Sequence, residues 1–454
     1  MSATDTMTMQ TGREPGLQTV HSQPASSQRT ELPAWPLAAV YFGFPVWWFL
    51  GIVDFIYIPI ACIMAVYLIQ RRAIFTPPRF GVWLLFLVWV GCSVIGLTAA
   101  IQFVGFGYRF ANLLAYTVIF LYTFNARKSL NDRTVTGMLT WWWLLIVVGG
   151  YIAMAFPTGV FRTPMSYLVP DSLLSNDWVH LMVVRPLNQY NPDSYFKLDP
   201  RPSAPFIYTN QWGNAYSLLL PMVIAYLAQI RRDNSRRFWL LLLAIPVSFV
   251  PALYTTNRGM FLAVGIAALY VALRLAARRD IRGLLAIAAT SVVGLIVFQL
   301  LPIQDRLQTR SEATSLVDRA WLYLQSLDAI KDSVLFGYGR TFMADGAVDP
   351  VGTQGEFWIV LVSHGVGAVV LFLAWFALAF MRSFHWHDAV GLAANTVLLV
   401  ALVGFFYYGS VPHALPVIMI AAALVLRSTH PDADDPFGHL SGLEPSIEKG
   451  VGRS

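Results

Sequence analysis

The sequence contains roughly a dozen apolar stretches that are long enough for a helix to cross a membrane, which takes about 20 residues. They lie at approximately 35–52, 53–70, 81–101, 108–125, 135–156, 209–230, 238–256, 259–277, 283–301, 356–381, 389–408 and 412–427. Only 12% of the residues are charged, whereas a soluble domain carries about 25%. We therefore predict an all-α, polytopic membrane protein with about 12 transmembrane helices.

The charges between these stretches predict how the chain is oriented. If the amino terminus is cytoplasmic and the helices alternate, the cytoplasmic loops are those at 71–79, 125–133, 231–237, 274–282 and 381–388. Each of them is basic or contains arginine, and the short loops on the other side carry little charge. Because cytoplasmic loops are enriched in Lys and Arg, we predict two cytoplasmic termini. Only a turn near Asp54 separates the first two stretches, and a single helix there would change the parity.

Two polar segments flank a single membrane domain, residues 34–429. Residues 1–33 are rich in Ser, Thr and Gln and contain no apolar run, so they do not resemble a signal peptide. We expect them to form a disordered cytoplasmic tail, and we expect the same of residues 430–454. The formal net charge of +6 requires no nucleic-acid partner, because the basic residues fall on the predicted cytoplasmic loops.

Two long segments, 157–208 and 302–355, fall on the extracytoplasmic side. Connections longer than about 15 residues are usually functional or disordered. In the second segment, apolar residues recur with near-helical spacing at Leu316, Ala320, Leu324, Leu327 and Leu335. This pattern predicts an amphipathic helix that lies on the outer membrane surface, and the two glycines of "FGYG" (336–339) end it.

Three arginines stand near the outer ends of predicted spans or on this loop: Arg109, Arg258 and Arg319. Arginine is well suited to bidentate phosphate recognition, so together they suggest a site for an anionic lipid headgroup or a phosphorylated substrate. Each of them also has a plain structural interpretation. Arg109 and Arg258 could snorkel at the interface, and Arg319 could be a solvated charge on a helix.

Amide and carboxyl side chains enter two of the predicted spans. In "RPSAPFIYTNQWGNAYSLLLP" (201–221), Tyr208, Asn210, Gln211 and Asn214 could bind sugar hydroxyls or form hydrogen bonds between helices. Gln354 and Glu356 stand at the mouth of another span, where Glu356 is a candidate base or hydrogen-bond acceptor. We interpret His364, two turns deeper, as a packed residue.

Several kinds of chemistry have no motif in this sequence. We find no metal site, no GxxxxGK[ST] phosphate loop and no nucleophile elbow. Cys62 and Cys92 both lie in apolar runs, which argues against a disulfide framework. We therefore expect no cofactor.

Three short segments resemble the bacterial O-antigen ligase and O-antigen polymerase superfamily of membrane glycosyltransferases. "TTNRGMFLAV" is similar to the family's Ser-Arg-Gly segment, with Asn257 where Ser is usual. "DRAWLYLQSLDAIKDSVLFGYG" is similar to the segment in which Arg and Trp precede a helix and "PLFGxG", with Val334 in place of proline. "QGEFWIVLVSHGVGA" is similar to the segment that carries a His in the ligases, and Gln354 occupies that position here. This last difference favours a polymerase over a ligase.

The resemblance implies a glycosyltransferase C-like fold in the bacterial inner (plasma) membrane. It implies that a glycan moves from an undecaprenyl-pyrophosphate carrier at the outer leaflet to a hydroxyl of a glycan or lipid-linked acceptor, without a metal ion. Arginines must then neutralise the leaving pyrophosphate. The expected site residues are Arg258, Arg319, Glu356 and Gln354 for catalysis, and Arg109, Arg340, Asp349, Asn210, Gln211, Asn214, Tyr208 and Trp321 for substrate binding. Membrane lipid and a flippase and chain-length regulator of the same pathway are the expected partners.

Three other functions remain open at this point. A ligase would attach finished chains to an acceptor. A flippase or transporter of lipid-linked oligosaccharide would share the many spans, but it should show internal repeats or broken helices in matching halves, and we see no such repeat. A membrane scaffold or co-polymerase would have fewer spans.

Overall fold

The computed structural model describes residues 31–71, 74–190, 198–233, 236–313, 316–343, 350–385 and 388–427, and for residues 310–319 it describes no side chains. The predicted tails therefore fall almost entirely outside the described part of the chain. Residues 31–33 are the exception. Leu32 is buried, and the carbonyls of Leu32 and Pro33 accept hydrogen bonds from Ser129 and Tyr122.

The described residues are mainly helical, and seven of the helices are long and apolar enough to cross a membrane. These are α5 (Ala100–Asn125), α6 (Asp132–Ala155), α9 (Thr209–Ile230), α10 (Arg236–Tyr254), α11 (Arg258–Ala277), α12 (Ile281–Leu300) and α15 (Glu356–Arg382). The prediction of an all-α membrane protein is confirmed at this level.

The remaining predicted spans are also helical, but they are shorter. They are α3 (Tyr57–Arg71), α4 (Gly81–Cys92), α16 (Ala389–Gly404) and α17 (Ala414–Arg427), with the first span divided into α1 (Trp35–Phe42) and α2 (Phe44–Leu50). The division falls at Gly43, where a Cβ atom would lie 2.3 Å from the carbonyl oxygen of Ala39. The count of twelve spans therefore stays a prediction.

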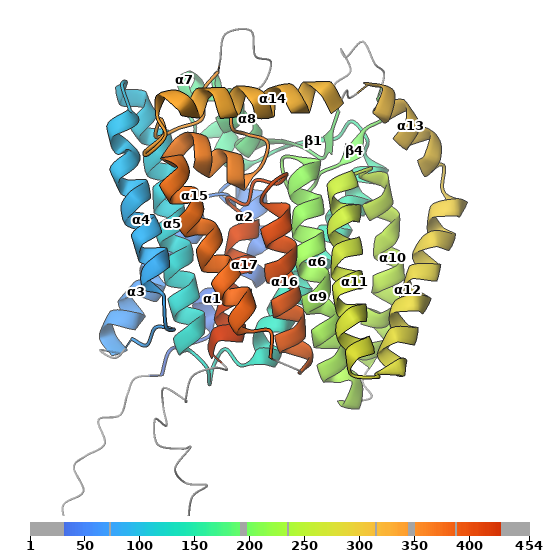
Figure 1. Ribbon diagram of the computed structural model, residues 1–454. Coiled ribbons are helices and arrows are strands. Elements are labelled where there is room, and N and C mark those ends of the chain that lie inside the picture. Colours follow the sequence, from blue (N-terminus) through green and yellow to red (C-terminus); the bar gives the residue numbers. More distant parts are fainter. Residues whose placement is uncertain are drawn as a thin grey trace, which may run out of the picture. The chain divides into compact units, whose positions relative to one another are not determined.

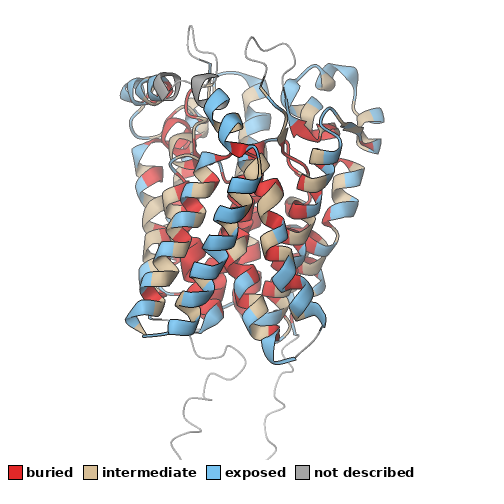
Figure 2. Ribbon diagram, turned by 90° about the vertical axis from the view of Figure 1, so that its right-hand side faces the viewer, coloured by how far each residue is buried: buried red, intermediate tan, exposed pale blue. Residues whose placement is uncertain are grey.

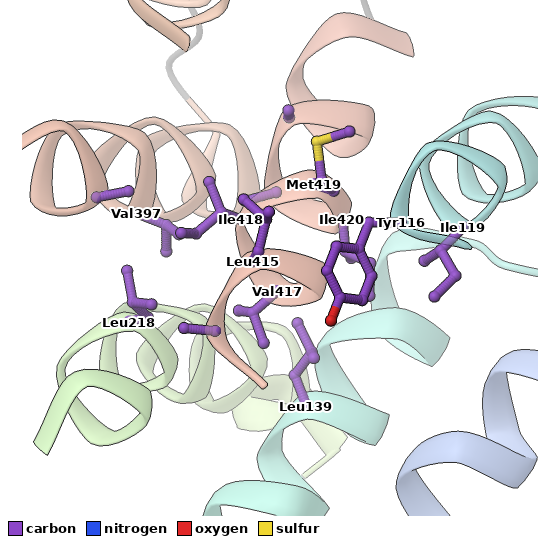
Figure 3. Packing of buried hydrophobic residues seen from close by; sticks show 14 of the residues in the cluster. Tyr116, Ile119, Leu139, Leu218, Val397, Leu415, Val417, Ile418, Met419 and Ile420 are labelled. Carbon is purple, nitrogen blue, oxygen red and sulfur yellow. The ribbon is translucent and has the colours of Figure 1, made fainter. Parts of the chain in front are cut away.

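The bundle is built around α17, in which every residue from Ala414 to Arg427 is buried. It packs against α5, α9, α15 and α16. Figure 3 shows its apolar side chains between Tyr116 of α5, Leu139 of α6, Leu218 of α9 and Val397 of α16. At the edge of the bundle, by contrast, α12 buries none of its residues. Figure 2 shows the same gradient, with buried positions between the helices and exposed positions on the outside.

One end of the bundle carries all of the strands found in the described residues, together with the helices that do not run along the bundle, and we call it the cap end (Figure 1). The first long loop forms β1 (Val160–Arg162), α7 (Asp171–Leu174), α8 (Asp177–Val183), β2 (Val184–Pro186), β3 (Asn188–Gln189) and β4 (Arg201–Pro202). The pairs β1–β2 and β3–β4 are antiparallel, and Phe161 lies opposite Arg185. The second long loop forms α13 (Ile303–Ala313) and α14 (Leu316–Ala329).

The predicted amphipathic helix of the second loop is present as α14, which lies across the cap end (Figure 1). It contacts the start of α15, where Tyr323 stacks on Trp358 with ring centroids 4.7 Å apart. Leu322 and Ser326 are buried, whereas Leu324 and Leu327 are exposed. The apolar stripe thus faces away from the bundle, and its contact with lipid stays a prediction.

At the opposite end the connections between helices are short, and both ends of the described chain lie there; we call it the tail end (Figure 1). Arg71 donates to the carbonyl of Asn125 at 2.7 Å, and Arg427 pairs with Asp132. Arg274 donates to the carbonyl of Phe384 at 2.6 Å. The basic loops that the sequence assigns to the cytoplasm therefore meet at one end of the bundle.

Candidate functional site

The connection Phe405–His413, between α16 and α17, is the centre of a polar cluster at the cap end. Gly409 and Pro412 keep it from being helical, because glycine is unfavourable in helices and proline lacks an N–H donor. Its backbone groups must find other partners where water is scarce. Those partners come from α5, α9 and α15.

Three side chains bind the backbone of this connection directly. Tyr116 of α5 donates to the carbonyl of Pro412 at 2.9 Å, and Asn214 of α9 donates to the carbonyl of Gly409 at 3.3 Å. Glu356 of α15 accepts the N–H of Ser410 at 2.6 Å. Two of the sequence-predicted site residues, Asn214 and Glu356, therefore meet on two neighbouring residues of one connection.

Glu356 and Arg109 interact electrostatically inside the bundle without a direct ion pair within 4.0 Å. Glu356 is only 4% exposed, and besides Ser410 it also accepts the backbone N–H of Val411. Arg109 lies close enough to attract this carboxylate electrostatically. Its Nη1 atom is buried and makes no hydrogen bond to any residue in the described part of the chain. The guanidinium therefore has a charge partner but an incomplete set of hydrogen-bond acceptors.

Arg109 also lies deeper in its helix than the sequence predicts. The prediction begins a span at 108, whereas α5 begins at Ala100. The chain turns earlier, at residues 97–99, because Gly96 packs against the backbone of Tyr338 with no space for a Cβ atom. Arg109 consequently stands about two and a half turns inside α5 rather than at its end.

A second buried charge cluster, which the sequence analysis missed, joins three distant segments. Asp54, in the turn between α2 and α3, pairs with Arg185 of β2 and lies 2.9 Å from Nε2 of His413. An ionised carboxylate only accepts hydrogen bonds, so this His413 nitrogen donates. Tyr57 lies 3.1 Å from the other ring nitrogen, and Tyr108 donates to the Asp54 carbonyl at 2.9 Å.

The environment of Asp54 determines its protonation state. Burial by itself raises the pKa of the Asp54 carboxyl, but the Arg185 guanidinium and the hydrogen bond to His413 outweigh it and hold the pKa well below its usual range. Asp54 is therefore a permanent buried anion at neutral pH. Both of its partners are fixed, since Arg185 belongs to the cap-end ribbon and His413 ends the Phe405–His413 connection.

Arg258 stands on the other side of the same connection, at the first position of α11. Asn257 caps this helix by accepting the N–H of Met260 at 3.2 Å, and Tyr408 donates to the same amide oxygen at 2.7 Å. A Cβ atom on Gly259 would lie 2.8 Å from the Tyr408 hydroxyl. The packing of "TTNRG" thus accounts for Asn257 and Gly259, while Arg258 remains exposed. It donates to the Leu307 carbonyl of α13 at 3.5 Å.

Two further arginines that the sequence analysis did not single out lie at this corner. Arg201 of β4 donates to the carbonyl of Thr255 at 2.6 Å. Arg306 of α13 pairs with Asp199 at 3.2 Å and lies over the ring of Tyr254. Both could have been noticed from their positions in the two long loops. Arg201 stands next to a proline, and Arg306 follows the predicted span 283–301.

The remaining predicted residues have different surroundings. Arg319 lies in the first turn of α14, and its side chain is not described; Asp349 lies outside the described residues. Trp321 is 60% exposed. Tyr208 and Asn210 are exposed, whereas the Gln211 amide oxygen caps α9 by accepting the Tyr208 N–H. Arg340 and Gln354 are half-buried, and the Gln354 amide donates to the Thr353 hydroxyl at 3.5 Å.

The segment "FGYG" has a backbone role, because it fills a break in α15. The helix is interrupted at Gly365, whose φ is 80°. The N–H groups of Tyr338 and Gly339 donate to the carbonyls of Val362 and Ser363 at 3.0 and 2.8 Å. Irregular backbone inside a membrane protein is tolerated where protein groups satisfy it in this way. His364 is buried beside the break, 2.6 Å from the Ser93 hydroxyl, which agrees with a packed histidine.

The cap end has cationic side chains that could contact an anionic ligand. Arg109 lies within a membrane-embedded helix, and Arg258 lies at the end of one. Within the described residues, no group of three or more His, Cys, Asp or Glu side chains is arranged to hold a metal ion. Arginines and backbone groups of the kind found here can bind and orient a charged ligand. No known family model and no curated protein matches this chain.

Proposed function

We propose that this chain is a membrane glycosyltransferase of cell-surface polysaccharide biosynthesis (O-antigen, capsule or exopolysaccharide). It transfers or polymerises glycan from an undecaprenyl-pyrophosphate donor at the outer leaflet. The observation that carries this proposal is Arg109, whose buried Nη1 lacks an acceptor among the described residues although it lies in a membrane-embedded helix. A charged side chain there is costly and indicates a functional site. A phosphate group would supply the missing acceptors, because guanidinium binds it in bidentate geometry.

The distribution of charge supports the orientation that this reaction needs. The tail end collects the basic connections, and cytoplasmic loops are enriched in Lys and Arg. The tail end is then cytoplasmic, with both termini, and the cap end faces the outer leaflet of the bacterial inner membrane. A donor flipped to that leaflet would present its pyrophosphate near the outer helix ends, where Arg258 begins α11 and Arg109 lies deeper, within α5.

In the proposed reaction an acceptor hydroxyl oxygen forms a bond to the anomeric carbon while the bond from that carbon to the pyrophosphate oxygen breaks. The hydroxyl proton must pass to a base, for which Glu356 and Asp349 are the candidates. Arginines stabilise the charge that develops on the leaving pyrophosphate. Arg109 would act within the bundle, and Arg258, Arg319 and Arg340 would act from the cap end.

The other groups of the site would hold the two glycans in place. Trp321, Tyr208 and Asn210 are exposed at the cap end, where a ring can stack on a sugar and an amide can bind its hydroxyls. Asn214 and Glu356 hold the Phe405–His413 connection, so they would position the floor of the site. Accurate positioning of both reactants supplies a large part of the rate enhancement in such reactions.

The test is to replace Arg109 with Lys and with Ala, and Arg258 with Ala, in cells that make the native polysaccharide. Arg162→Ala is the matched control, because Arg162 is an exposed arginine at the same end. Surface glycan and lipid-linked glycan are then resolved by size, after the membrane level of each variant is measured. Arg109→Lys keeps the charge opposite Glu356 but loses the guanidinium, so it separates phosphate binding from folding.

The outcomes distinguish the functions. Loss of long chains with accumulation of single lipid-linked repeats at the outer leaflet supports a polymerase. Long chains that accumulate on the carrier lipid identify a ligase, and repeats that stay on the inner leaflet identify a flippase. Normal glycan in all three variants, at normal protein levels, would refute the arginine site.

A further inference from the structure

His364 has a partner for one of its ring nitrogens and none for the other. Nδ1 lies 2.6 Å from the Ser93 hydroxyl oxygen, and that hydroxyl donates its proton to the Val90 carbonyl, also at 2.6 Å. A serine hydroxyl has only one proton, so Ser93 must accept a hydrogen bond from Nδ1–H. A neutral imidazole then carries its lone pair on Nε2. No residue in the described part of the chain donates to this nitrogen.

The packing around the break in α15 fixes the direction of this ring. Trp89 of α4 donates to the carbonyls of Leu335 and His364 at 2.9 and 3.2 Å. A Cβ atom on Gly365 would lie 2.1 Å from the Leu335 carbonyl oxygen, so the backbone beside the histidine has no room to move. The ring of Phe106 meets the imidazole edge to face, with centroids 6.3 Å apart. Nε2 is therefore held in place by neighbours from α4 and α5.

Arg109 brings a complementary group to the same place. It follows Phe106 by one turn on the same face of α5, and it lies close enough to act on His364 electrostatically. With 1.5 Å per residue, Arg109 and His364 stand roughly 14 and 12 Å from the first residues of α5 and α15. Within the described residues, Arg109 thus has an N–H group without an acceptor, and His364 has a lone pair without a donor.

A ligand that satisfies both groups must present an acceptor and a donor side by side. An anionic oxygen alone would accept from Arg109, but it would meet the Nε2 lone pair with lone pairs of its own. A sugar joined to phosphate through its anomeric carbon has both features, because the hydroxyl on the neighbouring carbon is a donor close to the phosphate oxygens. The two residues therefore fit a glycosyl phosphate better than a bare phosphate.

We propose that His364 is a specificity-determining residue that recognises the donor sugar. While Arg109 contacts the pyrophosphate, Nε2 accepts a hydrogen bond from the sugar hydroxyl next to the anomeric carbon. In glycoside hydrolysis, hydrogen bonds to this hydroxyl strengthen in the transition state, so the same contact would also assist transfer. This inference rests on the proposed function, and it adds a feature of the donor that an arginine cannot recognise.

The test measures how three synthetic lipids bind to the full-length protein in vesicles of neutral phosphatidylcholine. They are a polyprenyl pyrophosphate without sugar, the same lipid with glucose, and the same lipid with 2-deoxy-2-fluoroglucose, whose fluorine cannot donate. We expect the fluoroglucosyl lipid to bind about five- to tenfold more weakly than the glucosyl lipid, because it leaves the buried nitrogen unpaired. Equal binding of the two would overturn the proposal, and it is the result expected if a water molecule serves Nε2 instead.

Two variants and a matched control assign the effect to this ring. His364→Asn can still donate to Ser93 from the Nδ1 position but has no atom in the place of Nε2, so it should bind the two glycosyl lipids equally. Ser93→Ala frees the ring to carry its proton on Nε2, and it should also reduce the ratio of the two affinities. A ratio on one preparation does not depend on how much of the variant is folded.

Ser248→Ala is the matched control. Ser248 is fully buried like Ser93, donates to the Ile245 carbonyl at 2.6 Å and bonds the Tyr216 hydroxyl at 2.7 Å, but it lies in α10. It should keep the wild-type ratio. A ratio that persists in His364→Asn, or that falls equally in Ser93→Ala and Ser248→Ala, would overturn the proposal.

The lipid without sugar separates this inference from the proposed function. Arg109→Ala should weaken the binding of that lipid, whereas His364→Asn should not. If wild type and Arg109→Ala bind it equally, the proposed arginine site is wrong and the inference falls with it. If Arg109→Ala weakens its binding but wild type binds the two glycosyl lipids equally, only the assignment of His364 is wrong.

Discussion

The two ends of the bundle use charge in opposite ways. At the cap end, Asp54, Arg185 and Glu356 are buried, and their partners come from segments far apart in the chain. At the tail end, Arg71, Arg274 and Arg427 are also buried, but they donate to backbone carbonyls, and the Arg133–Asp233 pair is largely exposed. Exposed charges cost little, whereas buried charges need several partners to offset their desolvation. The comparison teaches that, among the described residues, the buried carboxylates Asp54 and Glu356 both lie at the cap end, whereas the buried arginines of the tail end serve helix-end carbonyls.

Arginine illustrates the same contrast. Tail-end arginines donate to carbonyls near helix ends, as Arg71 does to Asn125 and Arg274 does to Phe384. Such contacts satisfy carbonyls that have no partner within their helix. At the cap end, Arg109 lies within α5 and not at a helix end. Its Nη1 atom has no hydrogen-bond acceptor among the described residues. The Nε atoms of Arg185 and Arg306 share this property, so Arg109 is distinguished by its position inside the membrane-embedded helix α5.

The largest expected effect concerns the buried cap-end cluster. Asp54→Ala leaves Arg185 and His413 buried without their carboxylate, and breaking a buried pair costs about 3–5 kcal/mol. Asp171→Ala, at an exposed cap-end aspartate, should change stability by less than about 0.5 kcal/mol. Unfolding in detergent, followed by circular dichroism, measures both. If the two variants are equally stable, the buried Asp54 cluster does not stabilise the cap end.

The same cluster predicts a pH dependence with a definite sign. The pKa of Asp54 is held below its ordinary value, so its ion pairs contribute stability that is fully present above the unfolded-state pKa of about 3.9. That stability is lost as the pH falls below this value toward the folded pKa. Melting temperatures should therefore show no Asp54-dependent change between about pH 5 and 8. Asp54→Asn should lose part of the acid-induced fall, and an unchanged profile below about pH 4 would contradict the assignment.

A smaller effect is expected at the break in α15. In Gly337→Ala the new Cβ atom would lie 2.5 Å from the Val362 carbonyl oxygen, at a φ of 62°. We expect a loss of about 1–3 kcal/mol, typical of strain at such positions. Gly105→Ala in α5 is the control, because nothing lies within 4 Å of its Cβ position and Ala favours helices. Comparable melting temperatures for the two variants would show that the "FGYG" segment does not fill the break.

The smallest effect belongs to the tail end. Arg133→Ala removes an ion pair whose side chains are 54% and 37% exposed, and such pairs contribute at most about 1 kcal/mol. Asp233→Asn should give a similarly small change, and the double variant should show little coupling. A loss from Arg133→Ala as large as that from Asp54→Ala would remove the distinction between the two ends.

The sequence predicted the helices well because their signal is local. Apolar length identified the helices of the bundle, and the amphipathic spacing after residue 315 identified α14. The helix ends were less certain: α5 starts well before residue 108, since the packing of Gly96 against Tyr338 decides where the chain turns. The buried cluster was missed because Asp54 and His413 are 359 residues apart, and nothing local in either segment indicates the other.

What the sequence determined by itself is the membrane-embedded, all-α class, the position of the helices and the collection of basic loops at one end, because hydropathy and charge act residue by residue. Tertiary structure alone decided which polar side chains are buried together. It placed Glu356 and Asn214 on the Phe405–His413 connection, left Arg258 exposed and gave Arg109 an incomplete set of partners among the described residues. The physical reason is that the backbone groups of an irregular segment inside a bundle must be satisfied by whichever helices the packing brings near.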